Sequence, residues 1–384
     1  MNCLFNYKMV NLLMCRIRLT VFLSLALICG LACAPDLSVA AQGSLLTGSH
    51  GDNSIMPKSC RACHKGMSIG LSGEEDSCLD CHSDESRRLV AISKGALDGN
   101  TGRYTLKDIT AELRKTYNHP VLTVRGAHRY AEELPEMVVN AVRHSECVDC
   151  HNPHAVEVGA PYRGLMGHRE GNFITEIEEE FELCYRCHSD SANMPGRSTN
   201  KHAEFKTTNP SFHPVEGEGR SARVPSLKEP YVGVAERPGD ISRISCRDCH
   251  GSDDPAGPAG PHGSNYPGLL VLNYQMSDQV HENEYAYALC YKCHERTSIL
   301  SDESFPYHSL HIRGRGGAGF DGTSCITCHD AHGSTEYTSL IRFDERFVMY
   351  NANDELKYES QGVSARRGSC SLNCHGVEHV SKEY

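Results

Sequence analysis

Twenty cysteines are present in this 384-residue chain, and their spacing is its most informative chemical feature. Four of them lie before residue 34, and the other sixteen form eight pairs that each end in a histidine. In seven pairs two residues separate the cysteines, whereas the eighth pair, in Cys370-Ser371-Leu372-Asn373-Cys374-His375, has three. The sixteen cysteines are Cys60, Cys63, Cys78, Cys81, Cys147, Cys150, Cys184, Cys187, Cys246, Cys249, Cys290, Cys293, Cys325, Cys328, Cys370 and Cys374, and the histidines that follow the pairs are His64, His82, His151, His188, His250, His294, His329 and His375.

This spacing suits covalent haem attachment. The two thiols add to the vinyl groups of a haem, and the adjacent histidine binds the iron as its proximal ligand. A disulfide framework does not require a histidine after every second cysteine, and a zinc ribbon places no premium on one. The sequence therefore predicts eight haem c groups, attached through these sixteen cysteines and eight histidines.

Eight irons need eight sixth ligands, and fourteen histidines remain outside the motifs. An imidazole on each face would make every haem low-spin and relatively low in potential. Positions that recur along the chain, or that directly precede a motif, predict the distal ligands His50, His119, His144, His154, His213, His262, His311 and His332. The alternatives are His128, His168, His202, His281, His308, His379 and, as a thioether ligand, Met67.

The motifs recur in pairs, which indicates an internal repeat. Each later unit begins with an isolated histidine, as in Asn118-His119-Pro120. A motif then follows with a second histidine shortly after it, as in Asn152-Pro153-His154, and a further motif ends the unit. We expect haems one and two in residues 42–100, three and four in 101–200, five and six in 201–300, and seven and eight in 301–384.

The N-terminal region has the pattern of an export signal. Basic residues precede the apolar run from Leu19 to Cys33, and small residues near Ala41 suit cleavage, so residues 1–41 are predicted to be a signal peptide. Cys33 weakly resembles a lipidation site. The expected location is the periplasm, the outer membrane or the cell exterior. The formal charge of −11 argues against a nucleic-acid partner.

The composition predicts an irregular fold. Only 39% of the residues are hydrophobic, and 34 glycines and 17 prolines interrupt regular structure. We expect a loop-rich protein with short α-helices and little or no sheet, wrapped around a chain of stacked haems. The clearest expected helices enter second motifs, through Ile174, Ile177 and Phe181 and through Tyr285 and Leu289.

These motifs resemble those of the doubled-CXXCH multihaem c-type cytochromes of Geobacter-like metal-reducing bacteria. The resemblance rests on Asn152-Pro153-His154, on Asp330-Ala331-His332-Gly333-Ser334, and on a leucine before each second motif, as in Leu183-Cys184. It implies electron transfer through the periplasm, across the outer membrane within a porin complex, or outside the cell. It also implies distal ligation by His154, His262 and His332, although the insert from Gly251 to Pro261 departs from the simplest pattern.

The predicted function is therefore electron transfer with other redox proteins as partners, and with extracellular acceptors such as metal oxides. One alternative is an octahaem reductase or oxidase of a small nitrogen or sulfur compound, seated at the unusual C-terminal motif. The chain lacks the CxxCK motif of typical reductases of that kind. Another alternative is a subunit of a cytochrome filament or porin conduit, for which self-association would be needed.

Overall fold

A computed structural model describes most of the chain after the predicted signal region. The described residues are 46–58, 60–64, 74–122, 145–157, 160, 162–167, 169–170, 173–174, 176–190, 198–221, 224–231, 241–315, 322–362 and 365–384. The segment Thr47–Tyr384 forms one compact unit. The predicted signal peptide and residues Met67, His128, His144 and His168 lie outside the described residues. The division into four two-haem units stays a prediction.

Helices of one to three turns dominate the N-terminal half. They are α2 (Gly48–Gly51), α3 (Cys60–Cys63), α4 (Glu74–Leu79), α5 (Glu85–Ser93), η2 (Thr101–Arg103), α6 (Ile109–Leu113), α7 (Cys147–Cys150), α8 (Glu180–His188) and α9 (Lys201–Phe205). The nine-residue α5 begins where the Asp84 side chain accepts a hydrogen bond from the Arg87 amide at 3.0 Å, which caps a free N–H group of its first turn.

The C-terminal half continues in the same way. Its helices are η3 (Cys246–Asp248), η4 (Pro267–Leu269), α10 (Ala288–Tyr291), α11 (Arg296–Leu300), α12 (His308–Arg313) and η5 (Cys325–Thr327). No described helix is long and apolar enough to cross a membrane. The helix expected through Ile174 and Ile177 starts later, at Glu180, because Ile174 belongs to strand β3. The helix expected around Leu289 is the single turn α10.

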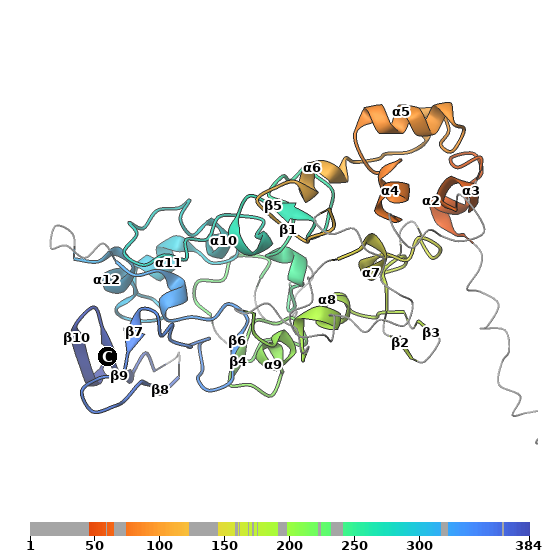
Figure 1. Cartoon of the computed structure of the whole chain (residues 1–384). Coiled ribbons are helices and arrows are strands. Elements are labelled where there is room, and N and C mark those ends of the chain that lie inside the picture. The colour runs from red at the N-terminus through yellow and green to blue at the C-terminus, as the bar shows by residue number, and fades with distance from the viewer. Residues whose placement is uncertain are drawn as a thin grey trace, which may run out of the picture. The chain divides into compact units, whose positions relative to one another are not determined.

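The described chain contains three pairs of two-residue strands. Two pairs join distant parts of the sequence, and one joins neighbouring segments. Strand β1 (Tyr117–Asn118) pairs antiparallel with β5 (Gly263–Ser264), and β4 (Ser211–Phe212) pairs with β6 (Gly333–Ser334). In Figure 1, β1 lies beside β5, and β4 lies beside β6. The third pair is local, between β2 (Arg169–Glu170) and β3 (Phe173–Ile174). The two long-range pairings bring the isolated histidine of one repeat to the following repeat.

The C-terminus carries a larger sheet than the sequence predicted. Strand β9 (Gly368–Cys374) is central, with β10 (Val377–Glu383) on one side and β8 (Lys357–Ser360) and β7 (Val348–Met349) along the other. Elsewhere the chain is as loop-rich as expected. The expectation of little or no sheet therefore holds only roughly, because β9 and β10 extend over seven residues each.

The principal apolar cluster lies against two motifs. Its buried members include Leu270, Tyr274 and Tyr287, and Tyr287 is fully buried. Cys290 and Cys325 pack against this cluster. The largest group of core side chains in the described chain thus surrounds the thiols of the sixth and seventh motifs and fixes their positions.

Candidate haem sites

Seven motifs adopt the same local turn. The backbone amide of the motif histidine donates to the carbonyl of the first cysteine, as from His64 to Cys60 at 2.8 Å and from His329 to Cys325 at 2.9 Å. The fourth motif lies wholly within α8. One helical turn brings residues three or four apart onto the same side of the chain, so the two thiols and the imidazole face one region. This is the geometry that a doubly attached haem requires.

Each of these seven histidines has a second imidazole opposite it. The ring centres of the seven pairs are 6.1 to 6.4 Å apart. The pairs are His64 with His154, His82 with His50, His151 with His262, His188 with His119, His250 with His332, His294 with His213, and His329 with His308.

These separations match the width of an iron coordinated from both faces. With metal–nitrogen distances of about 2 Å, and ring centres about 1 Å beyond the ligating nitrogens, two axial imidazoles have centres about 6 Å apart. Ordinary aromatic pairs also occur at such distances. The distinguishing observation is that seven motif histidines each face another histidine. The residues at these sites therefore fit haem, which supplies one-electron chemistry when bound.

Three equivalent junctions between repeats create six of these pairs. In each junction the isolated histidine of one repeat lies beside the second histidine of the next, and its Nδ1 bonds the carbonyl just before that residue. His50 bonds Pro153 at 2.9 Å, His119 bonds Pro261 at 2.7 Å, and His213 bonds Ala331. Since a carbonyl only accepts, Nδ1 carries the proton and Nε2 is left to bind iron.

A junction serves two sites at once. Its isolated histidine faces the second motif of its own repeat, as His119 faces His188. The other histidine faces the first motif of the preceding repeat, as His262 faces His151. Consecutive repeats are therefore interlocked, and a site in one repeat is incomplete without the next.

The hydrogen-bond partners of Nδ1 differ between the equivalent distal histidines His332 and His262. His332 Nδ1 lies 3.2 Å from a carboxylate oxygen of Asp330 and 3.6 Å from Glu204. Arg342 contacts both acids at 2.8 Å. Burial alone would raise the pKa of Asp330, but hydrogen bonds with His332 and the charge of Arg342 hold that pKa well below its usual value. His262 Nδ1, by contrast, is buried without a partner.

Burial favours the neutral form of four of the site histidines. It lowers the pKa of His82, His250, His262 and His294 to about 4, with nearby histidines adding to the effect at His82, His262 and His294. At His250 a hydrogen bond to Gly268 opposes the shift. A neutral imidazole is the form that binds a metal ion. The protein thus holds these rings in the protonation state that ligation needs.

The seven motifs also follow one another in space. Contacts join α3 to α4, α4 to α7, and α8 to η3, which link the first motif to the second, the second to the third, and the fourth to the fifth. The Cys290 thiol interacts directly with Cys325, and this contact links the sixth motif to the seventh.

Within the second and third repeats, a basic residue of the second motif bonds a carbonyl of the first. Arg186 donates to Asp149, and Lys292 donates to Asp248 at 2.6 Å. These bonds link the third motif to the fourth and the fifth to the sixth. The seven sites therefore form an unbroken series.

The structure places six of the eight predicted distal histidines opposite motif histidines: His50, His119, His154, His213, His262 and His332. On α12, His308 faces His329, whereas His311 Nδ1 bonds the carbonyl of Tyr307 at 2.7 Å. Recurrence in the repeat favoured His311, and ligation by His311 stays a prediction. Among the alternatives, His202 lies beside Tyr185 and Glu216 instead of facing a motif histidine.

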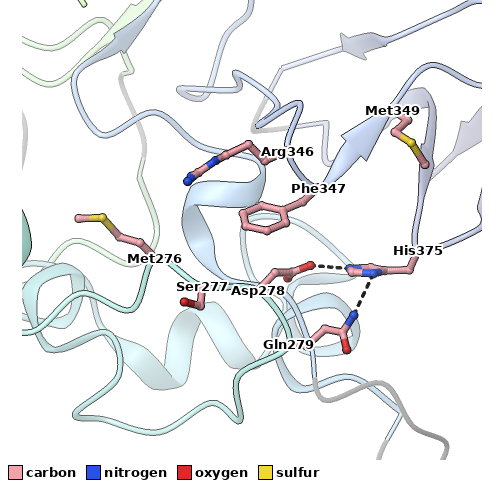
Figure 2. A pocket seen from close by; sticks show the side chains of 8 residues that line it. All are labelled: Met276, Ser277, Asp278, Gln279, Arg346, Phe347, Met349 and His375. Atoms are coloured by element: carbon pink, nitrogen blue, oxygen red, sulfur yellow. Dashed lines mark hydrogen bonds and ion pairs between the residues drawn. The ribbon is translucent and has the colours of Figure 1, made fainter. Parts of the chain in front are cut away.

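The C-terminal motif is built differently. Cys370 and Cys374 lie in the extended strand β9, and His375 follows in the turn to β10. His375 Nε2 lies 2.7 Å from a carboxylate oxygen of Asp278, and its Nδ1 is 3.3 Å from the side-chain nitrogen of Gln279. Figure 2 shows these contacts at the edge of a cavity of about 610 Å³, which Arg346, Phe347 and Met349 also line. Within the described part of the chain, His375 is the histidine that lines this cavity.

Tandem CxxCH turns with paired imidazoles define a multihaem c-type cytochrome. A protein-family model described as outer membrane cytochrome MtrC/MtrF-like, domains II/IV, matches residues 140–341. The chain belongs to this family of multihaem outer-membrane cytochromes, which transfer electrons in metal-reducing bacteria. Searches of curated proteins and of solved structures found no match. The expected class is confirmed at this level, and the doubled-CXXCH grouping stays a prediction.

Proposed function

We propose that this chain is an electron carrier that passes electrons along its series of haems, between redox proteins at the outer membrane and acceptors outside the cell. The observation that carries the proposal is the contact of each of seven consecutive motifs with the next. Covalent attachment at such short spacing holds neighbouring cofactors close enough for transfer and prevents their loss. The protein supplies position, ligation and local charge.

The proposed cofactor is haem c, bound through the cysteine pairs and ligated by the paired histidines. The sequence count of eight haems stays a prediction, and the present proposal rests on the seven motifs with paired imidazoles. Residues 1–41 are proposed to direct export. The proposed partners are other periplasmic or outer-membrane cytochromes, a porin, or further copies of this chain in a filament.

We propose a carrier rather than a catalyst. Reduction of a small nitrogen or sulfur compound at iron needs an open coordination position, and at seven sites both faces have an imidazole. A potential enzymatic site would lie at the C-terminal motif, where His375 contacts Asp278 and Gln279.

Protein-film voltammetry of the purified holoprotein tests this proposal. We expect a broad reversible wave from many coupled haems, rapid oxidation by soluble ferric chelates, and no catalytic current with nitrite, hydroxylamine or sulfite. A catalytic wave with one of these compounds would favour the enzyme. Lack of any reversible wave would refute electron transfer by this chain.

A further inference from the structure

The C-terminal motif departs from the other seven in its backbone. Cys370 and Cys374 are four steps apart along an extended strand, which puts their Cα atoms about 13 Å apart, whereas residues one helical turn apart lie about 5 to 6 Å from each other. Two thiols at the larger separation cannot both reach the vinyl groups of a haem that the adjacent His375 also ligates. The strand is fixed on both sides by hydrogen-bonded neighbours, so the local structure opposes a helical turn here.

His375 itself occupies a turn position. Cys374 pairs with Val377, which leaves His375 and Gly376 as a two-residue hairpin loop with φ values of 53° and 75°. Positive φ at both central residues defines a type I′ turn, whose twist suits the flanking strands. The Cys-His-Gly segment is thus the tip of a β-hairpin.

The iron-binding nitrogen of His375 is already engaged. Asp278 is largely buried, with one carboxylate oxygen accepting from Thr323 at 2.6 Å and the other contacting His375 Nε2 at 2.7 Å. An iron between two ligand atoms needs about 4 Å between them. The seven imidazole pairs keep such a gap, whereas the space between His375 and Asp278 is closed (Figure 2).

The junction pattern places an imidazole opposite the histidine of each of the other seven motifs. In the first three repeats the second motif faces the isolated histidine of its own repeat, and the first motif faces a histidine from the next repeat. In the fourth repeat, His308 faces His329 of the first motif. His375 of the second motif contacts Asp278 through its Nε2.

We infer that Cys370–His375 is not an eighth haem site but a β-hairpin held to the chain by the contact between His375 and Asp278, so that the folded protein carries seven haems. The contact joins the hairpin to the segment beside Thr323, just before the seventh motif. This inference builds on the proposed function, because it takes the other seven motifs to carry haem.

Intact mass spectrometry of the denatured holoprotein tests the count, because thioether-bound haems survive denaturation. The expected mass corresponds to seven haems, with Cys370 and Cys374 both alkylated by iodoacetamide. The double variant Cys370→Ser/Cys374→Ser should keep seven haems. The matched variant Cys325→Ser/Cys328→Ser should carry six. The count does not depend on whether either variant folds.

An eighth haem on the native chain, or the loss of one haem from Cys370→Ser/Cys374→Ser, would overturn the inference and leave the proposed function standing. A native chain without covalent haem would instead refute the proposed function. The two failures are therefore distinguishable in one spectrum.

Discussion

Replacing Asp330 by Asn should raise the reduction potential of the haem that His250 and His332 ligate. The Asp330 carboxylate lies 3.2 Å from His332 Nδ1 and accepts a hydrogen bond from this nitrogen. A carboxylate in this position makes the imidazole a stronger donor and favours the oxidised iron. The equivalent histidines His154 and His262 follow Asn152 and Gly260 at the same offset, so they lack this charge.

The structure sets the size of the effect. The imidazole adds about 4 Å between Nδ1 and the iron, so the carboxylate lies about 7 Å from it, and one charge at that distance is worth about 2.4 kcal/mol at an effective dielectric constant of about 20. For one electron this corresponds to about 100 mV. Arg342, 2.8 Å from Asp330, offsets part of this charge, which leaves an expected rise of about 50 mV.

Optical spectroelectrochemical titration measures this change. One component of the redox titration should move upward in Asp330→Asn while the others keep their potentials. Asp354→Asn is the matched control, because it removes an exposed carboxylate of the same charge. An unchanged titration, or a downward shift, would show that Asp330 does not tune this haem.

Three further predictions follow from the same contacts. Low-temperature EPR should separate two low-spin classes, because the imidazole planes of the first-motif sites in the first three repeats are 4° to 14° apart and those of the second-motif sites 47° to 80°; a single uniform signal would contradict this. His308→Ala should create one high-spin haem that binds carbon monoxide when reduced, and His311→Ala should not; the reverse result would restore His311 as the ligand. Arg296→Met should lower the free energy of unfolding by about 3 kcal/mol at neutral pH, because it leaves the buried Glu282 carboxylate without its cation, while the Tyr291 hydroxyl still donates to it. Burial alone would raise the pKa of Glu282, but Arg296 and Tyr291 hold it below its usual 4.5, so this stabilisation should be present above about pH 4.5 and fade as the pH falls; urea unfolding at several pH values checks it, and equal loss at all pH values would refute the pairing.

The haem-attachment motifs could be predicted from the sequence because each depends only on residues that are adjacent in the chain. A CxxCH segment needs only one turn to present its thiols and imidazole. Recurrence identified five of the facing histidines, and the position before the first two motifs identified His50. Which motif each histidine faces could not be predicted, because the partner of His64 is His154 in the next repeat and depends on long-range pairing. The choice between His308 and His311 depended on how α12 is oriented, which spacing alone does not reveal.

The C-terminal sheet shows a different limit. The segment Cys370-Ser371-Leu372-Asn373-Cys374 fits a haem motif with one extra residue between the cysteines. It also lies before a His-Gly pair that fits a two-residue hairpin turn. Seven similar motifs precede this segment, so the sequence pattern favours the haem interpretation. The strand pairings and the Asp278 contact come from residues up to about a hundred positions away, so the sequence pattern did not reveal them.

Quantitative low-temperature EPR of the oxidised holoprotein, followed by carbon monoxide addition to the reduced form, tests the central claim most directly. The account predicts low-spin ferric haem at every occupied site, seven per chain, and no carbon monoxide adduct. A high-spin haem that binds carbon monoxide would contradict bis-histidine ligation at the seven sites, or show that the C-terminal motif holds a haem with an open face.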